Sequence, residues 1–177
     1  MEEKVNPWKS NLTNGLILGL VGIVYSLLMY FLNLSLNKSQ SYIFMIIQIA
    51  VLYFLLKSYR DNFKHGQITF GQSVGAGVII NVYYAVIMAI FTYILYTMID
   101  PGLIAKQLAM AEEGMVKKGL PQATIDAGMA FTAKIMKPGI MAFTSTIFIV
   151  IWGVIISMLV SIFIKKEGNP LIDTPVN

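Results

Sequence analysis

The amino-acid sequence predicts an all-α membrane protein in which four transmembrane helices form two antiparallel hairpins, with an amphipathic helical insert between spans 3 and 4. The chain of 177 residues has a mean hydropathy of +0.70, and only 12% of its residues are charged, about half the share usual in soluble domains. Its apolar residues gather in four stretches, each able to reach the ~20 residues that a helix needs to cross ~30 Å of hydrocarbon. We therefore expect a single transmembrane domain over residues 1–177.

The first predicted span covers about residues 12–36. Its apolar run from Leu16 to Leu32 is longer than that of a usual signal peptide, and no small-x-small cleavage site follows, so we expect it to stay uncleaved. Asn6 and Pro7 predict a helix start, because Asn caps helix N-termini and Pro suits the first helical position. The short polar turn at residues 37–40 predicts an antiparallel hairpin with the next span.

The second span is expected at about residues 41–59 and the third at about residues 70–99. The strictly apolar part of the second span ends at Leu56, so we expect Lys57 to reach the headgroups by its methylene stem and the helix to continue to Tyr59. The third span is about 45 Å long by the helical rise. Asp100 and Pro101 end it, because the residue before a proline avoids the α region.

The segment 102–138 is rich in charged residues, yet its apolar residues recur at helical spacing. Those residues are Leu103, Ile104, Leu108, Met115, Val116 and Leu120 in the first half, and Ile125, Met129, Ala133 and Met136 in the second. They predict two short amphipathic helices, separated at Gly119-Leu120-Pro121. The fourth span follows at about residues 139–164. We expect the tail, residues 165–177, to be flexible because it shows no periodicity.

The positions of Lys and Arg favour an orientation with both termini in the cytoplasm. The inner side then holds Lys4, Lys9, Lys57, Arg60, Lys64, Lys165 and Lys166, and the outer side Lys38, Lys106, Lys117, Lys118, Lys134 and Lys137. The two sets are nearly equal in number. The inner set decides the orientation, because it lies in short segments near span ends, where the positive-inside rule acts most strongly.

No Asp, Glu, Lys, Arg or His lies within the apolar core of any predicted span. A proton-driven carrier is therefore disfavoured, because such carriers keep titrating groups in the membrane. Gln48 and Asn81 are the amides that enter the core. The preferred interpretation of each is an interhelical hydrogen bond, and the alternative is a contact with a substrate.

Small residues recur at helical spacing on three of the spans. They are Gly15, Gly19, Gly22 and Ser26 on the first; Gly71 and Gly75 beside Ser73, Gly77 and Asn81 on the third; and Gly153, Ser157 and Ser161 on the fourth. Such stripes let helix backbones approach closely. Packing within one chain is the preferred interpretation. The alternative is a homo-oligomer or a membrane-protein partner held by the same faces.

The connector between spans 2 and 3 is predicted to form a rigid hairpin. Arg60 and Asp61 are expected to pair, Gly66 to take a positive φ, and Thr69 to cap the next helix. His65 is the only histidine and the chain has no cysteine, which excludes multi-histidine metal sites, thiolate chemistry and disulfides. We assign no catalytic, cofactor-binding or metal-binding residue, and we expect no cofactor, no nucleic-acid partner and no enzymatic activity.

Tyr59-Arg60-Asp61-Asn62, Gly66, Phe70-Gly71-Gln72 and Asp100-Pro101 resemble motifs of a family of uncharacterised small four-span bacterial inner-membrane proteins, known as a domain of unknown function. The likeness covers nearly the whole chain. It implies a four-span topology and a location in the bacterial inner (cytoplasmic) membrane. It implies no activity and no site residues.

Two functions fit these features. The first is a non-enzymatic accessory, assembly or interaction subunit whose insert docks a partner or lies on the outer leaflet, through faces that carry Met110, Met115, Met129 and Met136. The alternative is an oligomeric channel or facilitator for a small solute, with Asn81, Gln48 and the glycine stripes along its path. An intramembrane enzyme is the weakest hypothesis, because no paired carboxylates or histidine cluster lie where a site would be dry.

Overall fold

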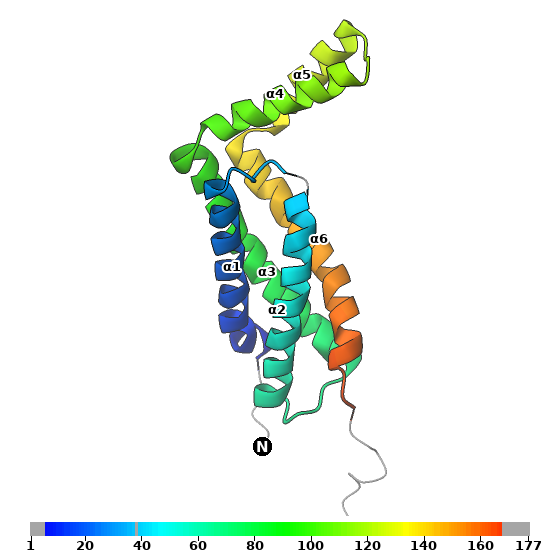
Figure 1. The fold of residues 1–177 in the computed structure, drawn as a ribbon. Coiled ribbons are helices and arrows are strands. Elements are labelled where there is room, and N and C mark those ends of the chain that lie inside the picture. Colours follow the sequence, from blue (N-terminus) through cyan, green and yellow to red (C-terminus); the bar gives the residue numbers. More distant parts are fainter. Residues whose placement is uncertain (1–5, 38, 168–177) are drawn as a thin grey trace, which may run out of the picture. The chain divides into compact units, whose positions relative to one another are not determined.

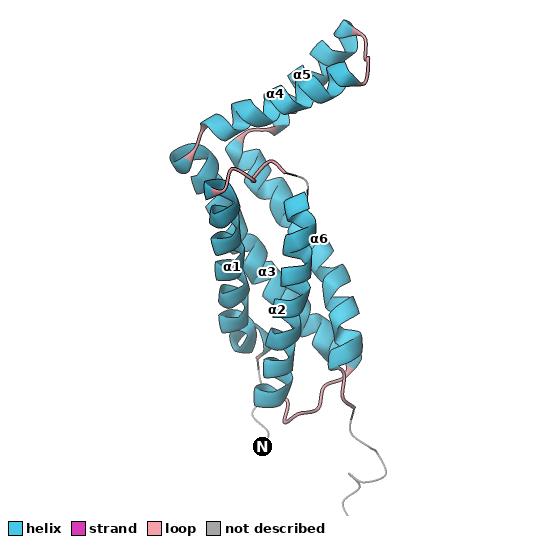
Figure 2. Ribbon diagram, in the orientation of Figure 1, coloured by secondary structure: helices cyan, strands magenta, loops and turns pink. Residues whose placement is uncertain are grey.

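The computed structural model describes residues 6–37 and 39–167, and every regular element in that part of the chain is a helix (Figures 1 and 2). The elements are α1 (Pro7–Phe31), α2 (Ser39–Phe63), α3 (Phe70–Ile94), a π-helical turn η1 (Leu95–Ile99), α4 (Gly102–Lys117), α5 (Gln122–Ile135) and α6 (Pro138–Ile164). Among the described residues, four stretches are long and apolar enough to cross a membrane: α1, α2, α3 with η1, and α6. The predicted all-helical structure with four helices apolar enough to cross a membrane is confirmed.

The chain divides into two compact units, which are described separately. Of the described residues, 6–85 and 148–167 belong to the first unit, which therefore holds α1, α2, the first part of α3 and the last part of α6. Residues 86–147 form the second unit, with α4, α5 and the adjoining ends of α3 and α6. A single transmembrane domain over residues 1–177 stays a prediction.

The start of α1 is capped as predicted. The side chain of Asn6 accepts a hydrogen bond of 3.0 Å from the backbone N–H of Trp8, and Pro7 is the first helical residue. This cap satisfies one of the backbone donors that a helix start leaves without a partner.

The end of α1 differs from the prediction, because the helix stops at Phe31 and not near Leu36. Asn33 takes a left-handed φ of 56°, its N–H donates to the carbonyl of Tyr30 (3.0 Å), and the N–H of Leu34 donates to the carbonyl of Met29 (2.8 Å). These two bonds form a Schellman motif, which ends helices at a glycine or asparagine. The apolar residues after Asn33 continue the hydropathy of the span without continuing its helix.

The connector between α2 and α3 has the predicted turn and cap. α2 continues past Tyr59 to Phe63, and Gly66 then takes a φ of 79°. The backbone N–H of Gln72 donates to Thr69 Oγ1 (3.3 Å), while the N–H of Thr69 donates to Gln72 Oε1 (3.2 Å). This reciprocal pair is a capping box, which satisfies two backbone donors at the start of α3.

The end of α6 is tied to the same connector. The backbones of Ile68 and Lys166 exchange two hydrogen bonds (2.9 and 3.0 Å), and Arg60 Nη1 donates to the carbonyl of Ile164 (3.2 Å). Lys166 therefore has a defined partner, although the flexible tail was expected to begin at Lys165. Residues 168–177 of the predicted tail lie outside the described residues. The ends of α2 and α6 and the start of α3 thus lie together.

In the second unit, α4 and α5 contact each other. Gly119 takes a positive φ of 68° in the turn between them. A Cβ built on Gly128 would lie 3.1 Å from the terminal carbon of Met115, so this glycine lets the two helices approach. Near the start of α4, Asp100 accepts hydrogen bonds from the N–H of Gly102 (3.0 Å) and from Lys106 Nζ (3.3 Å).

Candidate functional site

A row of buried polar side chains joins α2, α3 and α6 within the first unit, and we call it the polar seam. Each member is at most 4% exposed: Gln48, Ser73, Asn81, Ser157 and Ser161. Gln48 Nε2 donates to Asn81 Oδ1 at 2.9 Å, and the hydroxyl of Ser161 donates to that of Ser73 at 2.8 Å. The first of these is the interhelical hydrogen bond expected of Gln48 and Asn81. The seam therefore links three of the apolar helices by side-chain hydrogen bonds.

Two glycines allow α3 and α6 to approach closely enough to form the seam. A Cβ on Gly77 would lie 2.6 Å from the hydroxyl oxygen of Ser157, and a Cβ on Gly153 would lie 2.5 Å from the Cβ of Asn81. At Gly71 and Gly75 an added Cβ meets nothing within 4 Å. Packing within one chain, as predicted for the stripe of Gly71 and Gly75, is therefore wrong, whereas the same prediction for the adjacent stripe of Ser73, Gly77 and Asn81 is confirmed.

On α1, the glycines of the small-residue stripe are buried, and Gly15 packs against α3. A Cβ on Gly15 would overlap the Cβ of Tyr83, and Gly19 and Gly22 are buried. The wide ring of Tyr83 lies beside that of Trp8, with the ring centres 5.8 Å apart. The smallest residues of α1 therefore mark the face that packs within the chain.

Two buried asparagines on α1 were missed by the sequence reasoning. Asn11 is fully buried, and its Nδ2 donates to the carbonyl of Pro7 (2.9 Å). Asn14 donates to Asn11 Oδ1 at 3.2 Å. Asn11 stands four residues before Gly15, on the face that carries the glycine stripe, so that spacing could have identified it.

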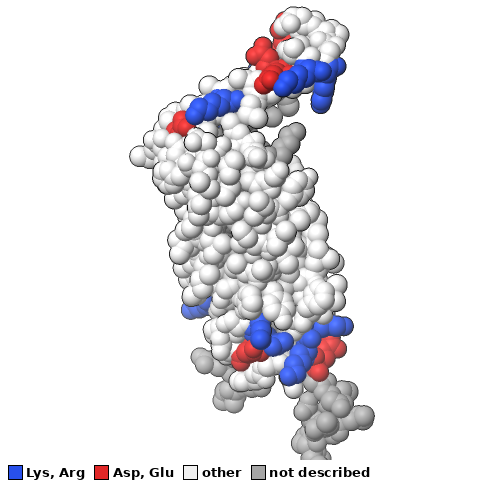
Figure 3. Space-filling model, viewed as in Figure 1, with Lys and Arg blue, Asp and Glu red and all other residues white. Residues whose placement is uncertain are grey.

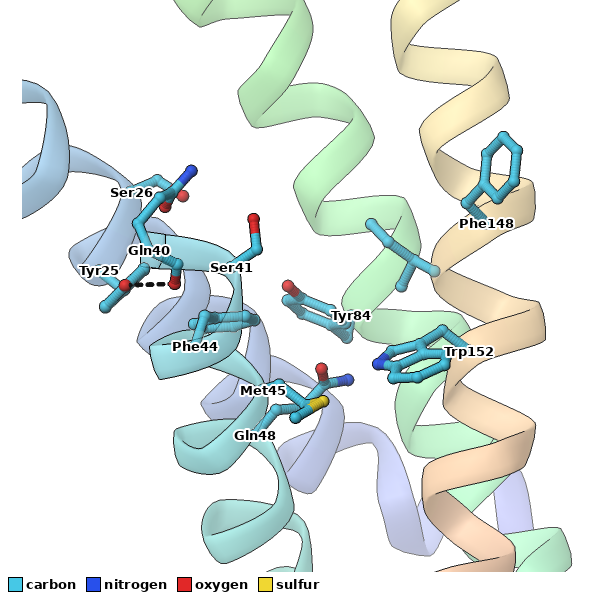
Figure 4. Close-up of a pocket in the computed structure, with 11 residues that line it drawn as sticks. Tyr25, Ser26, Gln40, Ser41, Phe44, Met45, Gln48, Tyr84, Phe148 and Trp152 are labelled. Carbon is cyan, nitrogen blue, oxygen red and sulfur yellow. Dashed lines mark hydrogen bonds between the residues drawn. The ribbon is translucent and has the colours of Figure 1, made fainter. Parts of the chain in front are cut away.

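Beside the polar seam, the first unit has a pocket of about 350 Å³ to which all four apolar helices contribute (Figure 4). We call it the aromatic pocket. Its lining residues are Tyr25 and Ser26 of α1; Gln40, Ser41, Phe44, Met45 and Gln48 of α2; Tyr84 of α3; and Phe148, Ile149 and Trp152 of α6. None of these residues is Asp, Glu, Lys, Arg or His. The pocket is therefore uncharged.

Aromatic rings form one wall of this pocket. The rings of Tyr25 and Phe44 lie 5.0 Å apart, and those of Phe44 and Tyr84 are stacked at 6.1 Å. The hydroxyl of Tyr25 donates to the carbonyl of Gln40 (2.7 Å), which fixes the first ring (Figure 4). On the α6 side lie Trp152 and Phe148, which are 45% and 73% exposed. Spaced rings of this kind present flat apolar surfaces to a bound molecule.

Two nearly buried polar side chains place unused oxygens at the pocket. Gln48 and Tyr84 are each 4% exposed. The amide nitrogen of Gln48 donates to Asn81, but within the described part of the chain neither Gln48 Oε1 nor the Tyr84 hydroxyl has a hydrogen-bond partner. No fully buried side-chain oxygen or nitrogen there lacks a partner. Both oxygens must therefore be partly accessible, and since both residues line the pocket, we place that accessible surface in the pocket.

In the second unit, large apolar side chains are exposed on α4, on α5 and in the turn between them. We call these five residues together the docking face: Met110, Val116, Leu120, Phe131 and Ile135, which are 38–64% exposed. Leu103 and Ile125, which belong to the predicted amphipathic faces, are buried. Of the methionines assigned to a contact surface, Met110 is exposed, whereas Met115 packs on Gly128.

Charged groups accompany the docking face. Lys117 Nζ lies 2.6 Å from Glu113 Oε1, one helical turn away. The hydrogen bond from Lys117, helped by its charge, holds the pKa of Glu113 below its ordinary value. Among the described residues no group of three or more His, Cys, Asp or Glu side chains is placed to hold a metal ion.

Comparison with known proteins identifies one family. The model of the family described as "Protein of unknown function (DUF4199)" matches residues 13–166. That match takes in α2 to α6 entirely and most of α1. No curated protein and no solved structure matches the chain.

Proposed function

The chain belongs to this family of proteins of unknown function, and we propose that it is a non-enzymatic accessory or assembly subunit of the bacterial inner membrane. In this proposal its apolar helices anchor it in the bilayer, and the docking face on α4 and α5 binds a partner membrane protein. The observation that carries the proposal is the exposure of these five large apolar side chains on one short helical pair, because apolar surface left exposed in this way is typical of interaction sites.

The proposed topology has two antiparallel hairpins, with α1 and α2 in the first and α3 and α6 in the second. The connector from α2 to α3 and both termini then lie in the cytoplasm, and α4 and α5 form the insert on the other side. The charge of the first unit supports this orientation. On the face shown in Figure 3, its charged side chains gather toward the end where α2 meets α3 and α6 finishes. Lys57, Arg60, Lys64 and Lys166 belong to that end, as the positive-inside rule requires.

A protein partner suits the docking face better than a lipid surface. Helices that lie on membranes carry a strongly basic polar face. On α4 and α5 the lysines are mixed with Glu112, Glu113 and Asp126. Such a mixed surface gives less attraction to anionic lipid and more scope for specific charge pairing with a protein.

The alternative, an oligomeric channel or facilitator, has less support from the geometry. Asn81 is fully buried and hydrogen-bonded to Gln48, so its amide is used in packing. A path would then have to form between copies of the chain. A liposome flux assay tests this alternative, and uptake of ions or small polar solutes by the purified protein would favour it over docking.

Site-specific photo-crosslinking in cells tests the docking proposal. A photoreactive phenylalanine analogue at Phe131 should form an adduct with a discrete protein, identified by mass spectrometry, whereas the same analogue at Gln67, an exposed residue of the connector between α2 and α3, should form little. The substitution Phe131→Glu should then remove that protein from material purified in mild detergent, and Gln67→Glu should retain it. Equal adducts at both positions, or adducts with lipid alone, would contradict the proposal.

A further inference from the structure

We propose that the aromatic pocket binds an uncharged, lipid-soluble molecule that carries a flat ring and a hydroxyl group. This site is separate from the docking face, which belongs to the second unit. The pocket volume of about 350 Å³ lies within the range of small-molecule sites, which run from about 300 to 1,000 Å³.

The ligand is uncharged because nothing at the pocket would compensate a charge. All lining residues are neutral, and four of the five rings belong to Tyr25, Phe44, Tyr84 and Trp152. An ion moved into such surroundings loses its hydration without gaining a counter-charge. A neutral molecule loses much less.

The ligand should contain a flat ring because aromatic side chains form one wall of the pocket. Tyr25, Phe44 and Tyr84 form a continuous series of neighbouring rings, and Trp152 reaches into the same space from α6 (Figure 4). Aromatic surfaces favour a flat partner that stacks on a face or meets it edge-on. A flexible alkyl chain would fill the same volume without using this geometry.

The ligand should carry a hydroxyl group because two oxygens at the pocket, Gln48 Oε1 and the Tyr84 hydroxyl, have no partner within the described part of the chain. Gln48 Oε1 only accepts hydrogen bonds, and its amide nitrogen is already held by Asn81. The Tyr84 hydroxyl both donates and accepts. A ligand hydroxyl can therefore donate to Gln48 or accept from Tyr84, whereas an ether or a halogen could not donate. In hydrocarbon, where water is scarce, a polar group without a partner is costly, which favours a ligand that supplies one.

The exposed side chains indicate entry from the bilayer. Phe148 and Trp152 line the pocket on α6 and are 73% and 45% exposed. α6 is one of the four helices apolar enough to cross a membrane, so the surface that these rings share faces lipid. The molecule would partition into the membrane first and reach the pocket between α2 and α6.

Fluorescence quenching tests the proposal, because the chain has two tryptophans and only Trp152 lines the pocket. In Trp8→Phe protein, purified in detergent, Trp152 is titrated with 4-bromophenol and with its isostere 4-bromotoluene, whose bromine also quenches indole fluorescence. Trp152→Phe protein, which keeps only Trp8, corrects for the different partition of the two probes into the micelle. Tyr84→Phe removes a hydroxyl without a protein partner, and Tyr53→Phe, at a tyrosine that does not line this pocket, is the matched control.

The proposal expects saturable quenching of Trp152, with 4-bromophenol binding about three to ten times more tightly than 4-bromotoluene, the value of one hydrogen bond. Tyr84→Phe and Gln48→Met should each bring this ratio toward one, and Tyr53→Phe should leave it unchanged. If Gln48→Met does not fold, Tyr84→Phe decides alone. Quenching of Trp152 that does not saturate, or a ratio that neither variant changes, would mean a pocket filled by water or lipid and would overturn the proposal.

Discussion

The close contact of α3 with α6 predicts that two identical substitutions, two positions apart on one helix, have opposite effects. Gly77→Ala places a methyl group 2.8 Å from the Cβ of Ser157, whereas Gly75→Ala places one where nothing lies within 4 Å. Rotation of the Ser157 side chain cannot relieve the contact, because its Cβ is fixed to the backbone. Gly77→Ala should therefore force α3 and α6 apart.

The size of the effect follows from these distances. Carbon atoms in contact lie about 3.5–4.0 Å apart, so the helices must separate by about 1 Å. Overpacking of this kind costs about 1–3 kcal/mol. Separation also weakens the bonds of Ser161 with Ser73 and of Asn81 with Ser157, each worth about 0.6 kcal/mol in a membrane. The gain in helix propensity from glycine to alanine applies to both variants and cancels in their difference. Gly77→Ala should be less stable than Gly75→Ala by about 2–4 kcal/mol.

The difference is measured by reversible unfolding in mixed micelles, with the helical circular dichroism signal followed as denaturing detergent replaces mild detergent. Both variants carry the same substitution on the same helix, so they should be expressed and inserted to the same extent. A difference in stability then reports the packing alone. Equal stability of the two variants would refute the packing of Gly77 against α6, and with it the register of the polar seam.

Three further predictions use the same unfolding assay or its thermal counterpart. Asn33→Val should lose about 1–2 kcal/mol, because a branched residue resists the left-handed φ of 56°, and Asn33→Gly should not; equal losses would contradict the cap. A double-mutant cycle of Ser73→Ala and Ser161→Ala should give a coupling of about 0.6 kcal/mol, and zero coupling would contradict their hydrogen bond. The pKa of Glu113 is lowered by Lys117 in the folded state, so this pair stabilises α4 above the unfolded-state pKa and loses that contribution as the pH falls through the folded-state pKa. Wild type should therefore exceed Glu113→Gln slightly in stability at neutral pH and match it in acid, and a constant difference would refute the pairing.

The membrane class was predictable because it depends on quantities that the sequence contains. A span needs about 20 apolar residues whatever its neighbours are, so hydropathy located all four helices. The caps at Asn6 and Thr69 were predictable for a similar reason, since they depend on residues a few positions apart. The end of α1 was missed because hydropathy continues through Leu34, whereas the local backbone of Asn33 ends the helix.

The polar seam was predictable in kind but not in detail. Polar side chains on apolar helices need hydrogen-bond partners, and Gln48 and Asn81 bond to each other. Which glycine stripe on α3 would face a neighbour depended on the rotation of the helix. Gly75 and Gly77 belong to equally good stripes, yet only Gly77 is in contact. Helix periodicity defines the faces but not which of them is covered.

The aromatic pocket could not be predicted from the sequence. Its lining comes from four helices, with Tyr25 and Trp152 far apart in the chain. A pocket is the space that side chains leave unfilled, so it depends on every rotamer and helix position around it. The exposure of Phe131 on the docking face likewise follows from how α4 and α5 pair, whereas the helical spacing of the segment predicted only its amphipathic character.

The central claim is that the chain crosses the membrane with its α2–α3 connector inside and its docking face outside. Because the chain has no cysteine, single cysteines report this directly. We predict that a membrane-impermeant maleimide labels Lys118→Cys in intact cells and labels Lys64→Cys only after permeabilisation. Labelling of Lys64→Cys in intact cells, with Lys118→Cys protected, would contradict the account.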